Sequence, residues 1–386
     1  MSYHGHFENQ KQPKQPKKKM HKGLKIFLIV LAVLVVIIAA AAIAGWTYFH
    51  NMASKMNIVT LPSDLYNYTE ETTEPMENTE AAETTEAATE ATTVETTVPP
   101  MTADDIVNIL VVGQAARAGE ESHMADTSIL VSVNTYTGTV TLFSVLRDTL
   151  VKLPAYKDST GRSHTEGGAK FTVAYNLGYS WGGTADAMAY TNLTLYNNFG
   201  VEVDYNIEID FESFTKVIDY LGGVDIELTQ AEADYLNKDD LYVLYDVEAG
   251  VQHLDGMAAL SYARMRKAEG DSESDIKRSA RQRNLISVLL DKVRYLSLSE
   301  LQGVADTLLP LITTTMQPTD IAKLLVKIAP IISNLQLENA TMPMETTYWG
   351  EMYDIYGNGM QHSILRFDAG QNKKLIRAIT EAEISE

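Results

Sequence analysis

The 386-residue sequence contains no cysteine, which excludes disulfide bonds, thiolate metal sites and cysteine nucleophiles. Basic residues are also scarce: 31 Lys and Arg stand against 51 Asp and Glu, for a net charge of −20. Such a charge argues against a general nucleic-acid-binding surface, so nucleic acid is not an expected partner. Any cationic site must therefore be local and set in an acidic background.

A single long stretch, residues 26–49, carries no charge and is long enough to cross a bilayer, since roughly 20 apolar residues suffice. Seven lysines precede it, and very few basic residues follow for a long way. The positive-inside rule then predicts a cytoplasmic Lys-rich tail (1–25), which contacts anionic lipid headgroups, a transmembrane helix (26–49) and an extracytoplasmic remainder. A cleaved signal peptide is the alternative, but the apolar run exceeds the roughly 7–15 residues usual in such peptides.

Residues 50–104 are dominated by Thr, Glu and Ala, with few large apolar side chains. This composition predicts a disordered linker that carries the following domain away from the membrane. A glycosylated stalk fits the same composition. The domain itself is expected over residues 105–386.

Strand and helix patterns alternate through that domain. Strands are predicted at 107–112, 127–134, 139–145, 206–209 and 224–228, and helices at 170–177, 185–199, 212–221, 255–263 and 275–295, with further helix starts at Ser297, Ser299 and Thr319. The alternation predicts an α/β domain with a central mixed β-sheet covered by helices.

The last of the listed helices has an unusual face. Projected at about 100° per residue, Asp275, Arg278 and Gln282 share the inward stripe with the apolar residues that follow. Charged groups on a buried stripe are costly unless they are paired or bind something charged. Together with three further arginines, namely Arg264, Arg266 and Arg281, this stripe predicts a diphosphate site, because the planar guanidinium group suits phosphate oxygens. A structural salt-bridge network is the alternative.

Seven ordered blocks carry a family resemblance: VNILVVGQAAR (107–117), ADTSILVSVN (125–134), SVLRDTLVKLP (144–154), KFTVAYNLG (170–178), IDFESFTKVIDYLGGVDIEL (209–228), LDGMAALSYARMR (254–266) and DIKRSARQRNLI (275–286). Together they resemble the LytR-CpsA-Psr family from about residue 108 to 292. The resemblance implies a three-layer domain with a central mixed sheet. It also implies transfer of a glycopolymer from a polyprenyl diphosphate carrier to peptidoglycan, at the membrane, with Mg²⁺ or Mn²⁺ on the diphosphate.

The same resemblance assigns roles to individual residues. The catalytic set it implies is Arg147, Asp148, Arg264, Arg266, Asp275, Arg278 and Gln282, with Asp275 as a candidate base. The implied substrate-binding set is Arg117, Lys170 and Arg281, and the implied metal ligand is Asp126. Solvated surface charges are the alternative for Arg117 and Lys170, and an Asp that caps its own turn is the alternative for Asp126.

Two positions depart from the family pattern. Ala115 stands where the first metal-binding carboxylate is usual, and Met124 stands where an arginine is usual. One carboxylate plus substrate phosphates is still a sufficient ligand set for Mg²⁺. A second function is therefore open, that of a catalytically weak, membrane-anchored protein that binds polyprenyl glycolipids or has a regulatory role.

Overall fold

The computed structural model describes residue 51 and residues 54–62, 101–114, 125–238, 246–266, 268 and 274–381. The chain divides into two compact units, Met1–Asn51 and Met52–Glu386, and nearly all described residues belong to the second. Within the described residues, no helix combines the length and apolarity needed to cross a bilayer. The predicted tail and span, residues 1–25 and 26–49, lie outside the described residues.

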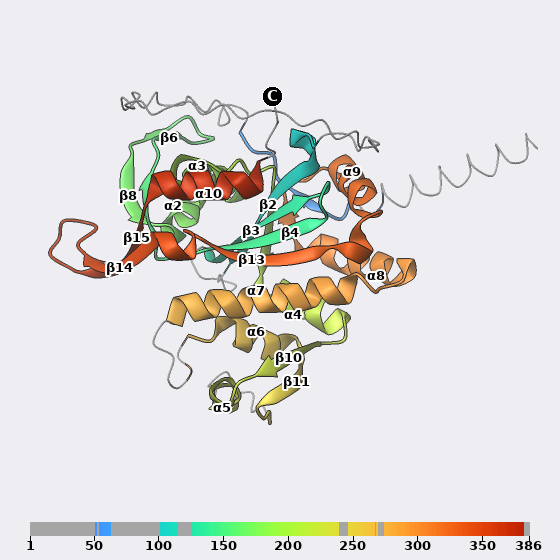
Figure 1. Cartoon of the computed structure of the whole chain (residues 1–386). Helices are drawn as coiled ribbons and strands as arrows, with labels where there is room; N and C mark the ends of the chain where they lie inside the picture. Colours follow the sequence, from blue (N-terminus) through green and yellow to red (C-terminus); the bar gives the residue numbers. More distant parts are fainter. Residues whose placement is uncertain are drawn as a thin grey trace, which may run out of the picture. The chain divides into compact units, whose positions relative to one another are not determined.

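A seven-stranded mixed sheet forms the centre of the second unit (Figure 1). Its strands, in spatial order, are β1 (Asn57–Ile58), β12 (Thr313–Thr314), β9 (Tyr205–Asp210), β2 (Ile106–Gln114), β3 (Ala125–Asn134), β4 (Thr139–Val145) and β13 (Gln336–Met342). Strand β3 runs antiparallel to both of its neighbours, β2 and β4, whereas β9 pairs in parallel with β2 and β13 pairs in parallel with β4. The predicted mixed sheet is confirmed, and four of the five predicted strands lie in it.

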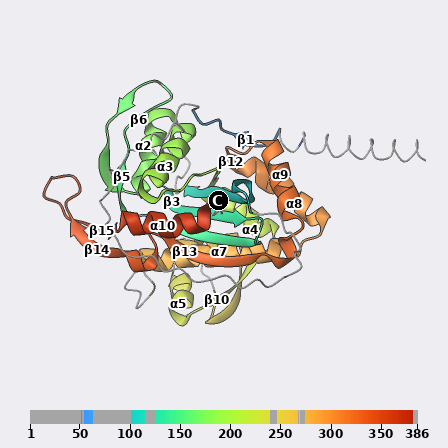
Figure 2. The same cartoon turned by 45° about the horizontal axis from the view of Figure 1, so that its top comes forward.

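Three helices cover one face of this sheet (Figure 2). They are α2 (Thr172–Gly182), α3 (Thr184–Phe199) and α10 (Ala369–Thr380). Leu110, Leu130 and Phe143 point from the sheet into a core with Tyr175 and Leu195 from these helices, and all five side chains are almost fully buried. This core sets the position of the strand ends that carry the site.

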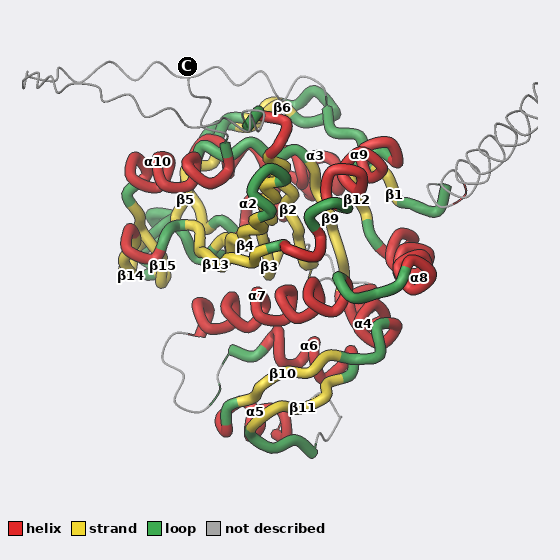
Figure 3. The backbone as a smooth tube through the Cα atoms, turned by 45° about the vertical axis from the view of Figure 1, so that its right-hand side comes forward, coloured by secondary structure: helices red, strands yellow, loops and turns green. Residues whose placement is uncertain are grey.

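The opposite face packs against α7 (Ser274–Val293), the predicted long helix. Ile286 and Leu290 contact the sheet, whereas Leu285 and Leu289 belong to a second core below. Figure 3 shows α7 lying between the sheet and the lower elements. The helix therefore has two buried faces, and Arg283, which lies off the inward stripe that the helical period predicts, is also buried, with 8% exposed.

The second core lies below α7 in Figure 1. Its elements are α4 (Phe211–Tyr220), α5 (Gln230–Lys238), α6 (Gly256–Arg264), β10 (Val224–Leu228) and β11 (Gly250–Leu254). The predicted strand at 224–228 is present as β10, but it pairs only with β11 and stays outside the central sheet. The domain thus adds a further layer to the three that the resemblance implies.

Strand β1 changes the predicted domain boundary. Residues 54–62 were expected in the linker, but Asn57 and Ile58 pair in parallel with Thr313 and Thr314 of β12. Val59 also donates its backbone N–H to Thr314 O at 2.8 Å, and Met56 is buried. The segment that follows the predicted span is therefore an edge strand of the sheet.

The remaining elements are small. They are the strand pairs β5 (Leu150–Leu153) with β8 (Gly167–Lys170), β6 (Tyr156–Lys157) with β7 (Ser163–His164), and β14 (Tyr348–Tyr353) with β15 (His362–Phe367), and the helices α8 (Leu298–Leu308) and α9 (Pro318–Ile328). Ser297 caps α8 as predicted, by accepting from Glu300 N. The start predicted at Thr319 is close to the observed N-cap of α9, Gln317.

Candidate functional site

The segment after β4 is held on both sides by backbone hydrogen bonds. Arg147 O accepts from Thr172 N at 3.2 Å, and Asp148 O accepts from Leu365 N at 2.9 Å. Because Thr172 begins α2 and Leu365 lies in β15, two separate elements fix this short stretch. The side chains of Arg147 and Asp148 are thereby presented at the end of the sheet where β3 begins.

Helix α6 delivers Arg264 to the same region. Asp255 caps the helix by accepting from Ala258 N at 2.8 Å, and this confirms the predicted cap. At Gly256 an added Cβ would lie 2.3 Å from Thr215 O, so only glycine allows α6 to pack this closely on α4. Arg264 ends the helix, and its guanidinium carbon lies 4.6 Å from the centroid of the Phe211 ring.

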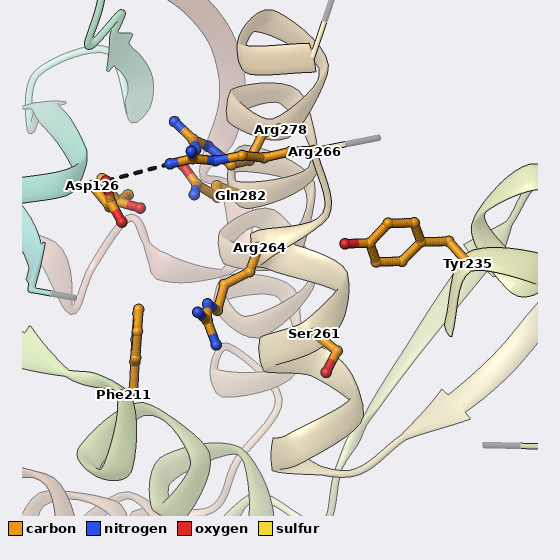
Figure 4. A pocket seen from close by; sticks show the side chains of 9 residues that line it. Asp126, Phe211, Tyr235, Ser261, Arg264, Arg266, Arg278 and Gln282 are labelled. Atoms are coloured by element: carbon orange, nitrogen blue, oxygen red, sulfur yellow. Dashed lines mark ion pairs between the residues drawn. The ribbon is translucent and has the colours of Figure 1, made fainter. Parts of the chain in front are cut away.

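A pocket of about 370 Å³ opens where β3, α4, α5, α6 and α7 meet. Its lining residues are Asp126, Thr127, Phe211, Tyr235, Ser261, Arg264, Arg266, Arg278 and Gln282. Figure 4 shows Arg266 and Arg278 directed toward Asp126. The structure thus brings together five of the predicted site residues, and three of those five are arginines.

Asp126, at the start of β3, joins two of the arginines. Its Oδ1 accepts from Arg147 in a short ion pair and lies 3.5 Å from Arg266 Nη2. The Nε–H of Arg147 is buried without a hydrogen-bond partner among the described residues, and so is that of Arg278. An unsatisfied buried donor costs about 1–3 kcal/mol. Several guanidinium groups therefore gather around few carboxylates, and two of them keep an Nε–H without an acceptor.

Arg278 is the most deeply buried arginine of the pocket, with 4% of its side chain exposed. Burial is the main cause that lowers the pKa of its guanidinium to about 10. The neighbouring Arg266 and Arg147 act in the same direction, whereas the Asp275 carboxylate partly opposes them. The pocket is thus electrostatically crowded with positive charge. Binding of an anion would reduce the repulsion between the guanidinium groups and would offer acceptors to their unused donors.

Two carboxyl groups, Asp148 and Asp275, lie behind the arginines, and each shifts the pKa of the other. Burial and the Asp148 carboxylate raise the pKa of Asp275, whose Oδ1 lies 3.0 Å from Arg278 Nη2. Burial alone would raise the pKa of Asp148, but the hydrogen bond with Asp275 and the 2.7 Å ion pair with Lys170 hold it below its ordinary value. Of the two carboxylates, Asp275 is therefore the stronger base.

Arg281 is not part of the pocket. Its Nε donates to Glu232 Oε1 at 2.6 Å, and its Nη1 donates to Met265 O at 3.2 Å. The predicted convergence of four arginines is therefore wrong for this residue, because the helical turn directs it into the second core. Arg117, the other predicted substrate contact, lies outside the described residues, together with Ala115 and Met124.

Four pocket residues escaped the sequence reasoning: Thr127, Phe211, Tyr235 and Ser261. Phe211 directly follows Asp210, the N-cap of α4, and lies within one of the seven sequence blocks that carry the family resemblance. Its position just after a predicted strand could therefore have identified it from the sequence. Tyr235 lies on α5, which had no predicted element, and we find no sequence signal that singles it out.

The donor set for a metal ion is sparse. Among the described residues, no group of three or more His, Asp or Glu side chains is placed to hold a metal. Asp126 is the carboxylate that lines the pocket, and it is paired with arginines. Mg²⁺ is often bound by one or two carboxylates together with phosphate oxygens and water. The residues present fit Mg²⁺ or Mn²⁺ only when a substrate supplies phosphate oxygens.

Fold and pocket together define an α/β protein with a cationic cleft suited to a phosphorylated ligand. Residues 65–372 match the model of the LytR_cpsA_psr family, so the chain belongs to that family. This membership confirms the resemblance carried by the seven sequence blocks.

Several curated relatives are similar to parts of the chain. The polyisoprenyl-teichoic acid–peptidoglycan teichoic acid transferase TagU of Bacillus subtilis is 32% identical over 190 residues, which are 49% of this chain and 52% of the relative. Biofilm regulatory protein A of Streptococcus mutans is 25% identical over 274 residues, or 69% of this chain and 59% of the relative. The chain spans about half the length of the curated transferases that it matches.

Solved structures share the fold. The crystal structure of TagV from B. subtilis aligns with a TM-score of 0.53 at 24% identity, over 72% of this chain and 98% of that one. The structure of TagT bound to LIIa-WTA aligns with a TM-score of 0.52 at 24% identity, over 72% and 92%. The mixed α/β architecture is therefore that of known family members.

Proposed function

We propose that this chain transfers a glycopolymer from a polyprenyl diphosphate carrier to peptidoglycan and forms a phosphodiester bond. The observation that carries the proposal is the pocket in which Arg264, Arg266 and Arg278 surround Asp126 beside Arg147. A diphosphate supplies further acceptors to these guanidinium groups and balances their charge. The names of the teichoic acid transferases to which the chain is similar support the same chemistry.

In the proposed reaction, the arginines hold the diphosphate while an acceptor hydroxyl attacks the phosphorus atom next to the sugar. A new P–O bond joins the acceptor to the glycopolymer phosphate, and the P–O bond to the lipid-side phosphate breaks. Polyprenyl phosphate leaves with the electron pair, and the hydroxyl proton passes to the Asp148–Asp275 pair, in which Asp275 has the raised pKa. Positioning and charge neutralisation carry most of such a reaction.

Asp126 would hold Mg²⁺ or Mn²⁺ together with the phosphate oxygens, and the ion would neutralise charge on the diphosphate. Lys170, paired with Asp148, completes the proposed set by keeping that carboxyl ionised.

We further propose that residues 26–49 anchor the chain in the cell membrane with its N-terminus in the cytoplasm and this domain outside. The carrier lipid and peptidoglycan both lie on that side of the proposed anchor. The positive-inside pattern of the first 25 residues supports this topology.

The second candidate function is binding of a polyprenyl glycolipid without efficient transfer. It is favoured by Ala115, which stands in place of a metal-binding carboxylate of the family pattern, and by the ion pairs already made by Asp126. The arginine cluster would then serve recognition or regulation alone.

The test is to incubate the full-length protein with a polyprenyl-diphosphate-linked saccharide, Mg²⁺ and peptidoglycan fragments, and to measure release of polyprenyl phosphate. Release by the wild type, dependent on the acceptor, supports the transferase. If the wild type binds the lipid without release, while Ala115→Asp/Met124→Arg releases it, the binding function replaces the proposal.

A further inference from the structure

We infer that the exposed face of α9 lies in the membrane surface and holds the domain with the β1 edge of its sheet toward the bilayer. The inference rests on the membrane anchor proposed above for residues 26–49. It concerns a surface that takes no part in the diphosphate pocket.

The length of chain between anchor and domain is the first observation. From the end of the predicted span at Phe49 to Asn57 in β1 there are only eight residue steps, which extend to at most about 28 Å. The actual reach is shorter, because Met56 is already buried in the domain and Lys55 Nζ lies 3.5 Å from Asp306. The β1 edge must therefore lie within about 28 Å of the end of the predicted span.

Helix α9 lies at that edge. It starts at Pro318, shortly after β12, the strand that pairs with β1. Figures 2 and 3 both show α9 beside β1 and β12. A surface on α9 is thus within reach of the lipid headgroups when the anchor is inserted.

The surface chemistry of α9 fits an anionic lipid surface. Leu325 and Val326 are 57% and 76% exposed, although aliphatic side chains are usually buried. Lys323 and Lys327 flank them, and with Asp320 they give the helix a net positive charge in a strongly acidic chain. Lys327 donates to Asp104 O on the domain, so Lys323, whose side chain is 76% exposed and 3.7 Å from Asp320, is the lysine beside the exposed apolar pair. An apolar pair next to lysines on a short amphipathic helix is the pattern of an interfacial helix.

The packing of α9 leaves that face available. None of the residues whose burial is described for this helix is buried, and Ile328 is the member that packs against the sheet core. The opposite side of the helix therefore makes the attachment to the domain, while Leu325 and Val326 project outward.

The absence of cysteine permits a direct test by single-site labelling. The full-length Val326→Cys variant is labelled with bimane and inserted into vesicles of phosphatidylglycerol and phosphatidylcholine. Interfacial helices bury their apolar face about 5–10 Å below the headgroup boundary, so a doxyl quencher near the top of the acyl chain should reach the label. Met360→Cys, on the loop after β14 and 60% exposed, is the matched control and should be quenched by aqueous iodide.

The expected result is strong quenching at position 326 by the doxyl lipid and weak quenching by iodide, with the reverse at position 360. Adding Leu325→Glu to the Val326→Cys variant should shift position 326 toward iodide quenching; because Leu325 is exposed, this change leaves the core intact. Iodide quenching at 326 in protein that co-sediments with vesicles would overturn the inference alone. Protection from both quenchers would assign the face to a protein partner and also overturn it.

Failure to co-sediment with vesicles would instead refute the anchor itself, and with it this inference. Release of polyprenyl phosphate by the same preparation in detergent reports separately on the proposed transfer reaction.

Discussion

Replacing Arg278 with methionine should weaken diphosphate binding without destabilising the fold. A pKa that falls from 12.5 to about 10 corresponds to about 3 kcal/mol against the charged guanidinium in the folded protein. Because the folded-state pKa lies below the unfolded one, this cost is present at every pH below about 10. Methionine removes the charge and keeps much of the volume, so stability should stay unchanged or rise by up to about 3 kcal/mol.

Ligand affinity should change in the opposite direction. A hydrogen bond to a charged group contributes about 1.5–3 kcal/mol, so loss of Arg278 should weaken binding roughly 10-fold to 100-fold. The assay is thermal unfolding of the full-length protein with and without farnesyl diphosphate, with affinity from calorimetric titration. The wild type should be stabilised by the ligand, and Arg278→Met should not.

Arg281→Met is the matched control, because it is one helical turn away and equally buried. This change leaves the Glu232 carboxylate buried without its 2.6 Å partner and should cost about 3–5 kcal/mol. Ligand binding at temperatures where the variant is folded should be near that of the wild type. The reasoning is refuted if Arg278→Met is as unstable as Arg281→Met, or if it binds farnesyl diphosphate as tightly as the wild type.

Three further predictions concern the same site. Asp148→Asn removes the negative neighbour that raises the pKa of Asp275, so the acidic limb of the pH–rate profile should move to lower pH. If the limb does not move, the Asp148–Asp275 pair takes no part in proton transfer. Ala115→Asp adds a second carboxylate and should tighten Mg²⁺ binding in the presence of a diphosphate, measured by Mn²⁺ competition; equal affinity would place residue 115 away from the ion. Phe211→Leu removes the ring that contacts the Arg264 guanidinium, an interaction of about 0.5–2 kcal/mol, and should weaken farnesyl diphosphate binding several-fold. Unchanged binding would show that this contact does not orient Arg264.

Local patterns predicted the central strands well. Thr139–Val145 is strand β4 with the predicted bounds, and Asp255 and Ser297 cap the predicted helices, because alternation and capping depend on neighbouring residues alone. The site residues on one helix face, Arg278 and Gln282, were also placed correctly by the helical period.

The predictions failed where a residue's position depends on contacts with parts of the chain that are distant in sequence. A single apolar stripe was assumed for α7, but the helix is packed on two sides, so Arg281 and Arg283 are buried away from the pocket. Likewise, Asn57 and Ile58 have no strand pattern of their own. Their conformation is fixed by β12, which lies more than 250 residues later in the sequence.

The pairing of strand β1 also changes the place of the Thr- and Glu-rich residues 63–100 in the domain organisation. Both ends of this segment return to the same domain, at residues 62 and 101, so the segment is an insertion within the domain rather than a spacer before it. Halving the length of such a closed loop changes its closure free energy by only about 0.6 kcal/mol. Changes in the length or composition of this stretch therefore leave unchanged the eight residue steps between residue 49 and β1.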